Sequence, residues 1–367
     1  MKVYSSKEIK NIALLGNDGS GKTTLTEALV YDSGQIARRG RITQHNTISD
    51  YFPVEQEYGY SVFSTVFHTE WNGKKLNIID CPGSDDFCGA AITAMSVTDT
   101  TLILINGSIG TEVGTQNHFR YTEKLKKPVI FLVNQLDSNE CNYDGIVEQL
   151  QMNYGSKAIP VQYPVETGDN FHQIIDVILM KQLTYKPEGG LPTIEDIPAD
   201  QLEKAQEMHR TLVEAAAEND EGLMEKFFET EQLTQDEMRE GIRKGMVTRS
   251  IFPIFCVCAY KNMGVARLME FVNDNVAAPC DTPAFKKTVA GKEMKCDSAN
   301  PAIAFAWKVA KDQHLGELCH LKVYDGELTS AMDVINSVNQ GKERIGQLLV
   351  CAGKNRQQVE KVCAGDI

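Results

Sequence analysis

The sequence GNDGSGKT at residues 16–23 is the feature that most constrains the fold of this chain. It follows an apolar segment at residues 11–15 that predicts a strand, and it precedes an amphipathic helix expected to begin near Lys22. This order is the setting of a phosphate-binding loop, whose backbone N–H groups point at a polyphosphate. We therefore expect Lys22 to bridge the β- and γ-phosphates of a nucleotide and the Thr23 hydroxyl to coordinate Mg²⁺. A glycine-rich turn that merely ends a strand is the alternative, and the flanking elements argue against it.

The sequence NQLD at residues 134–137 indicates which base is bound. It follows an apolar strand predicted at residues 129–133, and ligands of open α/β sheets bind at the carboxyl ends of strands. The Asp137 carboxylate can accept both N1–H and N2–H₂ of guanine, whereas adenine offers no such pair of donors. Asn134 can tie this loop to the phosphate loop, because an amide both donates and accepts. The tetrapeptide alone also fits a polar turn after a buried strand, but its place after the phosphate loop favours a guanine-nucleotide pocket.

The chain resembles the N-terminal part of elongation factor G over essentially its whole length. EQEYGYSV resembles the family's switch I, NIIDCPG its switch II, and CVCAYKNMGV its base-closing loop; these segments are residues 55–62, 77–83 and 256–265. Two further stretches, residues 194–227 and the ending VCAGDI at residues 362–367, also match. Ribosomal protection proteins of the tetracycline-resistance type are close relatives and remain an alternative.

The motifs and the resemblance together imply a site for GTP or GDP with Mg²⁺. The residues expected to contact the nucleotide are Asp18, Gly19, Ser20, Gly21, Lys22, Thr23, Thr24, Gly83, Asn134, Gln135, Asp137, Cys258, Ala259 and Tyr260. Thr23 and Ser61 are expected to bind the metal directly, with Asp80 just outside the direct ligands. The Ala259 N–H is expected to donate to guanine O6.

One departure from the family pattern concerns catalysis. Ser84 stands where the family has a histidine that orients the attacking water, and serine is shorter, does not titrate near neutrality and cannot become a cation. Loss of such a group typically lowers a rate by a factor of about 10² to 10⁴. We therefore expect slow or absent GTP hydrolysis, even on the ribosome, although Lys22 is kept. Asp85 or Asp86 could substitute, but a carboxylate beside the γ-phosphate would repel it.

Other departures affect affinity rather than identity of the ligand. Gln135 replaces a lysine that covers the base, keeps part of its apolar stem and loses the cation, which predicts weaker binding with the same base preference. Gly19 replaces an aspartate implicated in holding a monovalent cation. In switch I, Tyr58 replaces an arginine, whereas Ser61 keeps the hydroxyl expected on Mg²⁺. Cys258 replaces a serine, and we expect this change to be mild.

The fold class expected is α/β, a phosphate-loop NTPase with helices on both faces of a mostly parallel sheet. The alternation that predicts it comprises strands at residues 11–15, 61–69, 76–80, 101–105 and 129–133 and helices at residues 22–31, 86–97 and 115–125. An Asn72-Gly73 turn predicts an antiparallel hairpin at one edge.

Four regions are expected along the chain. Residues 1–154 and 250–278 form the nucleotide domain, and residues 155–249 form an inserted α+β subdomain with helices at 199–217 and 234–245. Residues 279–300 read as a linker, and residues 301–367 as an incomplete β-barrel resembling domain II of translational GTPases. We expect the sequence to be part of a longer chain, because the family adds further strands and three more domains.

Composition limits the partners. The chain has 367 residues and a net charge of −13, which disfavours a surface that coats DNA. The N-terminus MKVYSSKEIK lacks the apolar core of a signal peptide, and the longest apolar runs are too short to span a membrane. We expect a cytoplasmic monomer whose ten cysteines are reduced thiols. By resemblance, its partner is the ribosome, through rRNA and stalk proteins.

Three functions are therefore to be compared. The leading one is an elongation factor G-like translation factor with impaired GTP turnover, acting in translocation. A non-enzymatic GTP-sensing module is the second, because bound nucleotide could simply hold switch I and switch II in place. An unrelated phosphate-loop ATPase is the third, and Asp137 argues against it.

Overall fold

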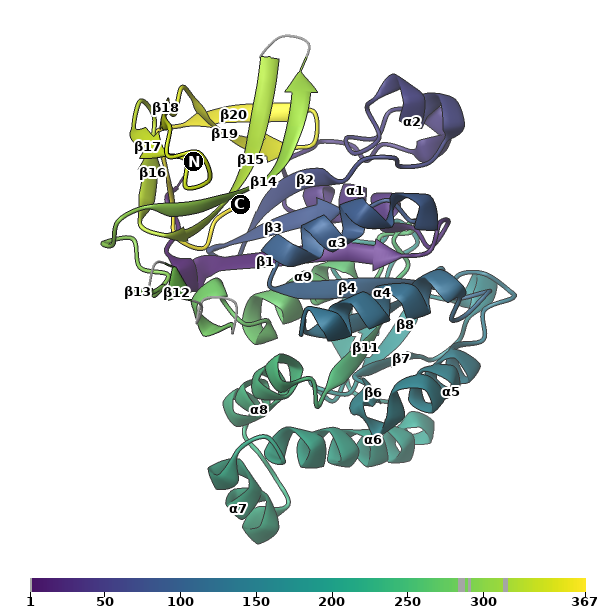
Figure 1. Cartoon of the computed structure of the whole chain (residues 1–367). Coiled ribbons are helices and arrows are strands. Elements are labelled where there is room, and N and C mark those ends of the chain that lie inside the picture. Colours follow the sequence, from purple (N-terminus) through teal and green to yellow (C-terminus); the bar gives the residue numbers. More distant parts are fainter. Residues whose placement is uncertain (1, 283–287, 290–291, 313–315) are drawn as a thin grey trace.

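A computed structural model of the chain describes residues 2–282, 288–289, 292–312 and 316–367 (Figure 1). Its centre is a seven-stranded sheet in the order β2-β3-β1-β4-β5-β11-β6. These strands are β1 (Ile9–Gly16), β2 (Thr65–Trp71), β3 (Lys74–Asp80), β4 (Thr100–Asn106), β5 (Val129–Asn134), β6 (Ala158–Pro160) and β11 (Phe252–Cys256). Only the β2–β3 pair among them is antiparallel, so the mostly parallel sheet expected from the sequence is confirmed.

The inner strands are apolar runs because helices cover both of their faces. Every residue of β1 and of β5 is buried, as is typical of parallel strands between two helical layers. Helices α3 and α4 lie on one face of the sheet and α1 and α9 on the other (Figure 1). The edge hairpin turns at Asn72 and Gly73, both with positive φ, which matches the twist of the flanking strands.

The described residues contain nine α-helices. They are α1 (Lys22–Asp32), α2 (Pro53–Tyr58), α3 (Cys88–Val97), α4 (Val113–Lys124), α5 (Tyr143–Tyr154), α6 (Ala199–Ala217), α7 (Glu221–Thr230), α8 (Gln235–Thr248) and α9 (Val265–Asn275). Within the described ranges, none of them combines the length and apolar character that crossing a bilayer requires.

Two expected boundaries differ from the structure for physical reasons. The strand predicted at residues 61–69 begins only at Thr65, because the N–H groups of Val62 and Phe63 donate to the Glu55 carboxylate instead of to a neighbouring strand. The helix predicted at residues 86–97 begins with a 3-10 turn, Asp85–Phe87, before α3 starts. Both differences lie in the segments that resemble switch I and switch II, whose backbone is next to the expected nucleotide site and is not part of the sheet there.

A second, antiparallel sheet follows in the order β10-β9-β8-β7, and α6, α7 and α8 come after it in the chain. Its strands are β7 (Gln162–Pro164), β8 (Gln173–Asp176), β9 (Lys181–Thr184) and β10 (Thr193–Glu195). Strand β6 lies inside the range expected for the inserted subdomain, yet it is the edge strand of the main sheet. The three helices lie at the end of the molecule away from the C-terminal strands (Figure 1).

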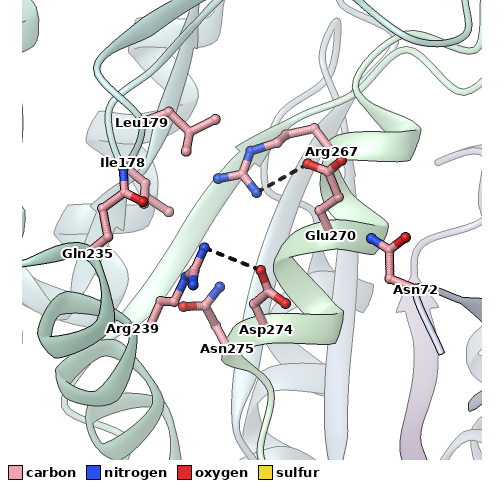
Figure 2. Close-up of a pocket in the computed structure, with 9 residues that line it drawn as sticks. All are labelled: Asn72, Ile178, Leu179, Gln235, Arg239, Arg267, Glu270, Asp274 and Asn275. Atoms are coloured by element: carbon pink, nitrogen blue, oxygen red, sulfur yellow. Dashed lines mark ion pairs between the residues drawn. The ribbon is translucent and has the colours of Figure 1, made fainter. Parts of the chain in front are cut away.

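A polar pocket marks the joint between these helices and the nucleotide domain (Figure 2). Arg239 of α8 faces Asp274 of α9 at 3.6 Å, and Arg267 faces Glu270 at 3.9 Å. The buried Asp176 of β8 also accepts from Arg267, at 2.8 Å. Ion pairs from α8 and from β8 therefore join the inserted region to α9.

The C-terminal part consists of paired antiparallel strands, which agrees with the β-rich region expected there. Among the described residues the pairs are β12–β13, β14–β15, β16–β21, β17–β18 and β19–β20. The strands are β12 (Thr288–Val289), β13 (Lys292–Glu293), β14 (Ile303–Asp312), β15 (Gly316–Asp325), β16 (Glu327–Thr329), β17 (Asp333–Ile335), β18 (Lys342–Arg344), β19 (Leu348–Ala352), β20 (Asn355–Val359) and β21 (Lys361–Cys363). Within the linker expected at residues 279–300, residues 283–287 and 290–291 lie outside the described residues.

A seam of buried polar groups joins this C-terminal region to the central sheet. Lys75 of β3 donates to both carboxylate oxygens of Asp366, at 2.7 and 2.9 Å, and Asn77 donates to the same carboxylate at 2.9 Å. Asn11 of β1 donates to the carbonyl of Gly365 at 2.8 Å.

A second ion pair extends the seam. Lys322 of β15 lies 3.5 Å from the Asp99 carboxylate, which also accepts from Asn11 at 2.6 Å. Burial lowers the pKa of Lys322, and the Asp99 charge opposes that shift. We call the seven residues that make these contacts the polar seam; they are Asn11, Lys75, Asn77, Asp99, Lys322, Gly365 and Asp366.

Candidate nucleotide-binding site

The glycine-rich loop leaves β1 and wraps around the Lys22 side chain. The Lys22 ammonium is buried and donates to the carbonyls of Gly16 and Asn17, at 3.0 and 2.9 Å. Burial lowers the pKa of Lys22, and the Asp80 charge partly offsets that shift. Of the described residues, no carboxylate lies within ion-pair distance of this ammonium, so its charge is available to an anion. Ser20 Oγ is also buried, and among the described residues it has no hydrogen-bond partner.

Two glycines are required for the close approach of this loop to its neighbours. Gly21 has a φ of 94°, and a Cβ there would lie 2.3 Å from Asn134 Nδ2. A Cβ on Gly83 would lie 2.5 Å from Lys22 Nζ and 2.7 Å from the Asp18 backbone nitrogen. The end of switch II is therefore packed directly against the phosphate loop, and Ser84 follows at once.

Ser84 serves as a cap of the 3-10 turn that begins switch II's helical part. Its hydroxyl accepts from the Asp86 N–H at 3.4 Å. The neighbouring Asp85 accepts from Asn117 of α4, also at 3.4 Å. Both side chains are thus engaged in local contacts.

Hydroxyl and carboxylate oxygens gather where the metal is expected. Thr23 Oγ1 lies 3.3 Å from Ser61 Oγ, and Ser61 donates to Asp50 Oδ1 at 2.7 Å. Ser49 donates to Asp80 Oδ2 at 2.7 Å, while no described residue hydrogen-bonds to Asp80 Oδ1. Hard oxygen ligands of this kind suit Mg²⁺, so the donor set fits the metal.

The protein alone provides little positive charge to stabilise the ionised carboxylates of this cluster. Burial, and then the charge of Asp50, raises the pKa of Asp80 to about 7. Burial also raises the pKa of Asp50, which Ser61 opposes. A bound cation would favour the ionised form of both groups. Asp50 is not among the metal-site residues expected from the sequence; its signal there is an acidic side chain a few residues before the switch I motif.

Switch I is folded around two buried glutamates that the sequence analysis also did not single out. Glu27 of α1 accepts from the N–H groups of Gly40 and Ile48. Glu55 of α2 accepts from Val62 and Phe63, at 3.0 and 3.1 Å. Burial raises the pKa of both carboxyls, although these backbone hydrogen bonds oppose it. They fix the loops on either side of Asp50.

Asn134 links three loops at the expected base site. Its Nδ2 donates to the Ser20 carbonyl at 2.8 Å, and its Oδ1 accepts from the Ala259 N–H at 3.0 Å. The link between the NQLD loop and the phosphate loop is thus present. Gln135, in a left-handed conformation with φ 62°, donates to the Gly19 carbonyl at 2.8 Å. Since the Ala259 N–H already has an acceptor, guanine O6 would share or replace that bond.

The remaining predicted residues surround Asp137. Lys261 Nζ lies 3.8 Å from Asp137 Oδ2. Cys258 is fully buried, and burial, followed by the Asp137 charge, raises the pKa of its thiol to about 12. Tyr260 is 57% exposed at the rim, and Thr24 is half-buried in the first turn of α1. The residues expected from the sequence to contact phosphate, metal and base therefore lie together at the carboxyl ends of the parallel strands.

Comparison with known proteins agrees with this geometry. Residues 7–278 match the family described as elongation factor Tu GTP binding domain. The chain is also similar to a protein of Thermus thermophilus whose crystal structure is known, with a TM-score of 0.87 and 28% sequence identity over 98% of this chain. It spans about half, 51%, of the length of that protein. Because the family match covers most of the sequence, this chain belongs to the translational GTPase family defined by the elongation factor Tu GTP-binding domain.

Proposed function

We propose that this chain binds GTP with Mg²⁺ and forms the nucleotide-dependent part of a translation factor of the elongation factor G type. Family membership supports the guanine nucleotide, and the cluster of Thr23, Ser61, Asp50 and Asp80 supports the metal. The factor acts on the ribosome, in the cytoplasm and as a monomer. Residues 155–249 act as an inserted subdomain that meets the ribosomal stalk.

GTP hydrolysis is slow or absent in this proposal. The observation that carries it is Ser84, whose hydroxyl caps the Asp86 N–H in the place where the family has an imidazole. Asp85 is held by Asn117 on α4, so it gives no support to a substitute role. Binding and catalysis would thus be separate properties of this site, with the phosphate-gripping groups kept and the water-positioning group lost.

Single-turnover cleavage of GTP by the full-length protein, with and without ribosomes, tests this proposal. We expect little phosphate release from the parent, and an increase of about 10² or more in Ser84→His. Ser84→Ala is the matched control, since it removes the hydroxyl without adding an imidazole. Brisk ribosome-stimulated release by the parent would contradict the proposal.

A GTP-sensing module without any enzymatic role is the second candidate. Contacts between the switches favour it, because Tyr60 of switch I lies 6.4 Å from Phe87 beside switch II, ring to ring, and Ser61 meets Thr23. Such contacts let a bound triphosphate order both segments without being cleaved. A sensor would leave Ser84→His inactive on the ribosome, whereas an impaired GTPase would be rescued.

The base preference is tested separately. Competition between GTP and ATP should favour GTP strongly, because only guanine offers two donors to Asp137. Asp137→Asn should shift the preference toward xanthine nucleotides. An unchanged guanine preference in this variant, or equal binding of ATP, would overturn the assignment of Asp137.

A further inference from the structure

Arg39 connects two parts of the nucleotide site that are far apart in sequence. It lies in the segment between α1 and switch I, and its Nη1 donates to the carbonyls of Ala259 and Tyr260, at 2.9 and 3.0 Å. Both carbonyls belong to the base-closing loop. A single guanidinium therefore holds two successive peptide units of that loop.

Further contacts surround this link. The Arg39 guanidinium lies 5.8 Å from the centre of the Tyr31 ring, and the Arg41 guanidinium lies 5.2 Å from the Tyr260 ring. At the end of α1, Asp32 accepts from Asn262 of the base-closing loop at 2.6 Å. The loop is thus supported from one side by α1 and by residues 39–41.

Peptide geometry explains what this support does for a base. In a trans peptide the carbonyl and the following N–H point in opposite directions, so holding the Ala259 carbonyl turns the Tyr260 N–H away from Arg39. Within the described part of the chain no acceptor is seen for the Tyr260 N–H, whereas the Ala259 N–H is bonded to Asn134. The Tyr260 N–H is therefore a donor of this loop that no described residue accepts, and it suits an acceptor such as guanine O6.

Arg39 is also fixed to the metal side of the site. The next residue, Gly40, donates to Glu27 at 2.6 Å, and Ile48 donates to the other oxygen of the same carboxylate. Ile48 directly precedes Ser49 and Asp50, which contact Asp80 and Ser61. The chain from Arg39 to Asp50 therefore runs from the base-closing loop to the metal cluster.

We propose that Arg39 is a positioning residue that couples the base-closing loop to the ordering of switch I. This inference rests on the proposed binding of guanine nucleotide. Order at the metal cluster, which needs the triphosphate, steadies the base-closing loop through Arg39, and a bound base steadies switch I in return. Arg39 also places a cation at the rim of the base site, where Gln135 has removed the family's lysine.

Calorimetric titration of the nucleotide-free, full-length protein tests the coupling. We expect Arg39→Ala to weaken GTP·Mg²⁺ binding about tenfold and GDP binding no more than about threefold, because GDP leaves switch I free of the link. The GTP·Mg²⁺ affinity of Arg39→Lys should lie between those of the parent and Arg39→Ala, because the lysine ammonium keeps the charge but not the planar guanidinium. Arg38→Ala is the matched control, because it removes the same charge from the neighbouring, exposed residue.

Equal losses for GTP and GDP, or a loss matched by Arg38→Ala, would overturn the proposal. Hydrogen exchange of residues 258–263 in the protein saturated with GTP·Mg²⁺ gives a second readout, and we expect it to quicken in Arg39→Ala but not in Arg38→Ala. Unchanged exchange in a protein that binds GTP normally would overturn the role of Arg39 by itself. A parent protein that binds no guanine nucleotide would instead overturn the proposed function, and the coupling with it.

Discussion

The nucleotide site and the polar seam both bury charges, but they compensate those charges differently. In the seam, Lys75 meets the Asp366 carboxylate at 2.7 and 2.9 Å, and Asn77 completes the arrangement. In the nucleotide site, the hydrogen bonds of Lys22 within the described part of the chain go to carbonyls, and Asp80 Oδ1 has no hydrogen-bond partner there. A buried charge without a partner is costly. The charges of the seam are therefore paired within the chain, whereas those of the nucleotide site would be compensated by an ionic ligand.

Replacing a buried lysine by methionine should mainly lower stability in the seam and mainly lower ligand affinity in the nucleotide site. Lys75→Met keeps much of the side-chain volume and leaves Asp366 buried without its cation, so we expect a loss of about 3–5 kcal/mol in the free energy of unfolding. Urea denaturation measures it. Lys181→Met is the control, because its pair with Asp196 is exposed and should contribute less than about 1 kcal/mol. Equal effects of the two variants would show that the seam contributes no more than a surface ion pair.

Lys22→Met should affect the ligand more than the fold. Loss of a charge-assisted contact to the phosphates is expected to weaken GTP binding by about 100-fold, or roughly 3 kcal/mol. The free energy of unfolding of the nucleotide-free protein should change less than in Lys75→Met, because Lys22 makes no ion pair with any described carboxylate. Calorimetry and denaturation of the same preparation test both statements. A variant that unfolds as readily as Lys75→Met would break the contrast between the regions.

The pH dependence of stability should also separate the regions. Because the pKa of Asp80 is raised to about 7 in the folded protein, its stabilising contribution is full below the unfolded value near 4 and is lost as pH rises through 7. Between pH 6 and pH 7 the loss is about 1 kcal/mol. Other groups also titrate in this range, because burial lowers the pKa of His118 and of His320 to about 4. The loss due to Asp80 should therefore appear as the difference between the parent and Asp80→Asn when the nucleotide-free proteins are denatured at each pH. An identical slope in both proteins would mean that Asp80 is already ionised at pH 6.

The smallest effect is expected at Cys258. Serine fits the same buried place and keeps a donor for Asp137, so Cys258→Ser should change GTP affinity and stability by less than about 0.5 kcal/mol. Cys258→Val, which removes the donor, is the comparison. A large loss in Cys258→Ser would show that the thiol itself shapes the base site.

Local sequence was enough for the elements that carry motifs. Residues 199–217 form α6 as expected from apolar periodicity, and the Asn72-Gly73 pair forms the hairpin turn. The phosphate loop lies between β1 and α1 as its motif requires. In each case the signal lies within a few residues of the feature that it predicts.

Contacts between distant residues could not be read in the same way. Lys75 and Asp366 are 291 positions apart, and Arg39 and Ala259 are 220 apart; each residue alone resembles an ordinary surface charge or loop residue. Helix α2 has only six residues, too few for a periodic pattern. The sequence thus predicts the ligand groups well and the groups that support them poorly, because support comes from the tertiary fold.

Strand β3 has a mechanical consequence. Lys75 and Asn77, near one end, grip the last residues of the chain, and Asp80 at the other end lies beside the metal cluster. The five residue steps from Lys75 to Asp80 span about 17 Å of extended chain, which stretches very little. A force on the C-terminal strands would therefore be transmitted along β3 to the turn at residues 80–83. A load on the C-terminal strands would therefore reach Asp80, beside the metal cluster, through the strand itself.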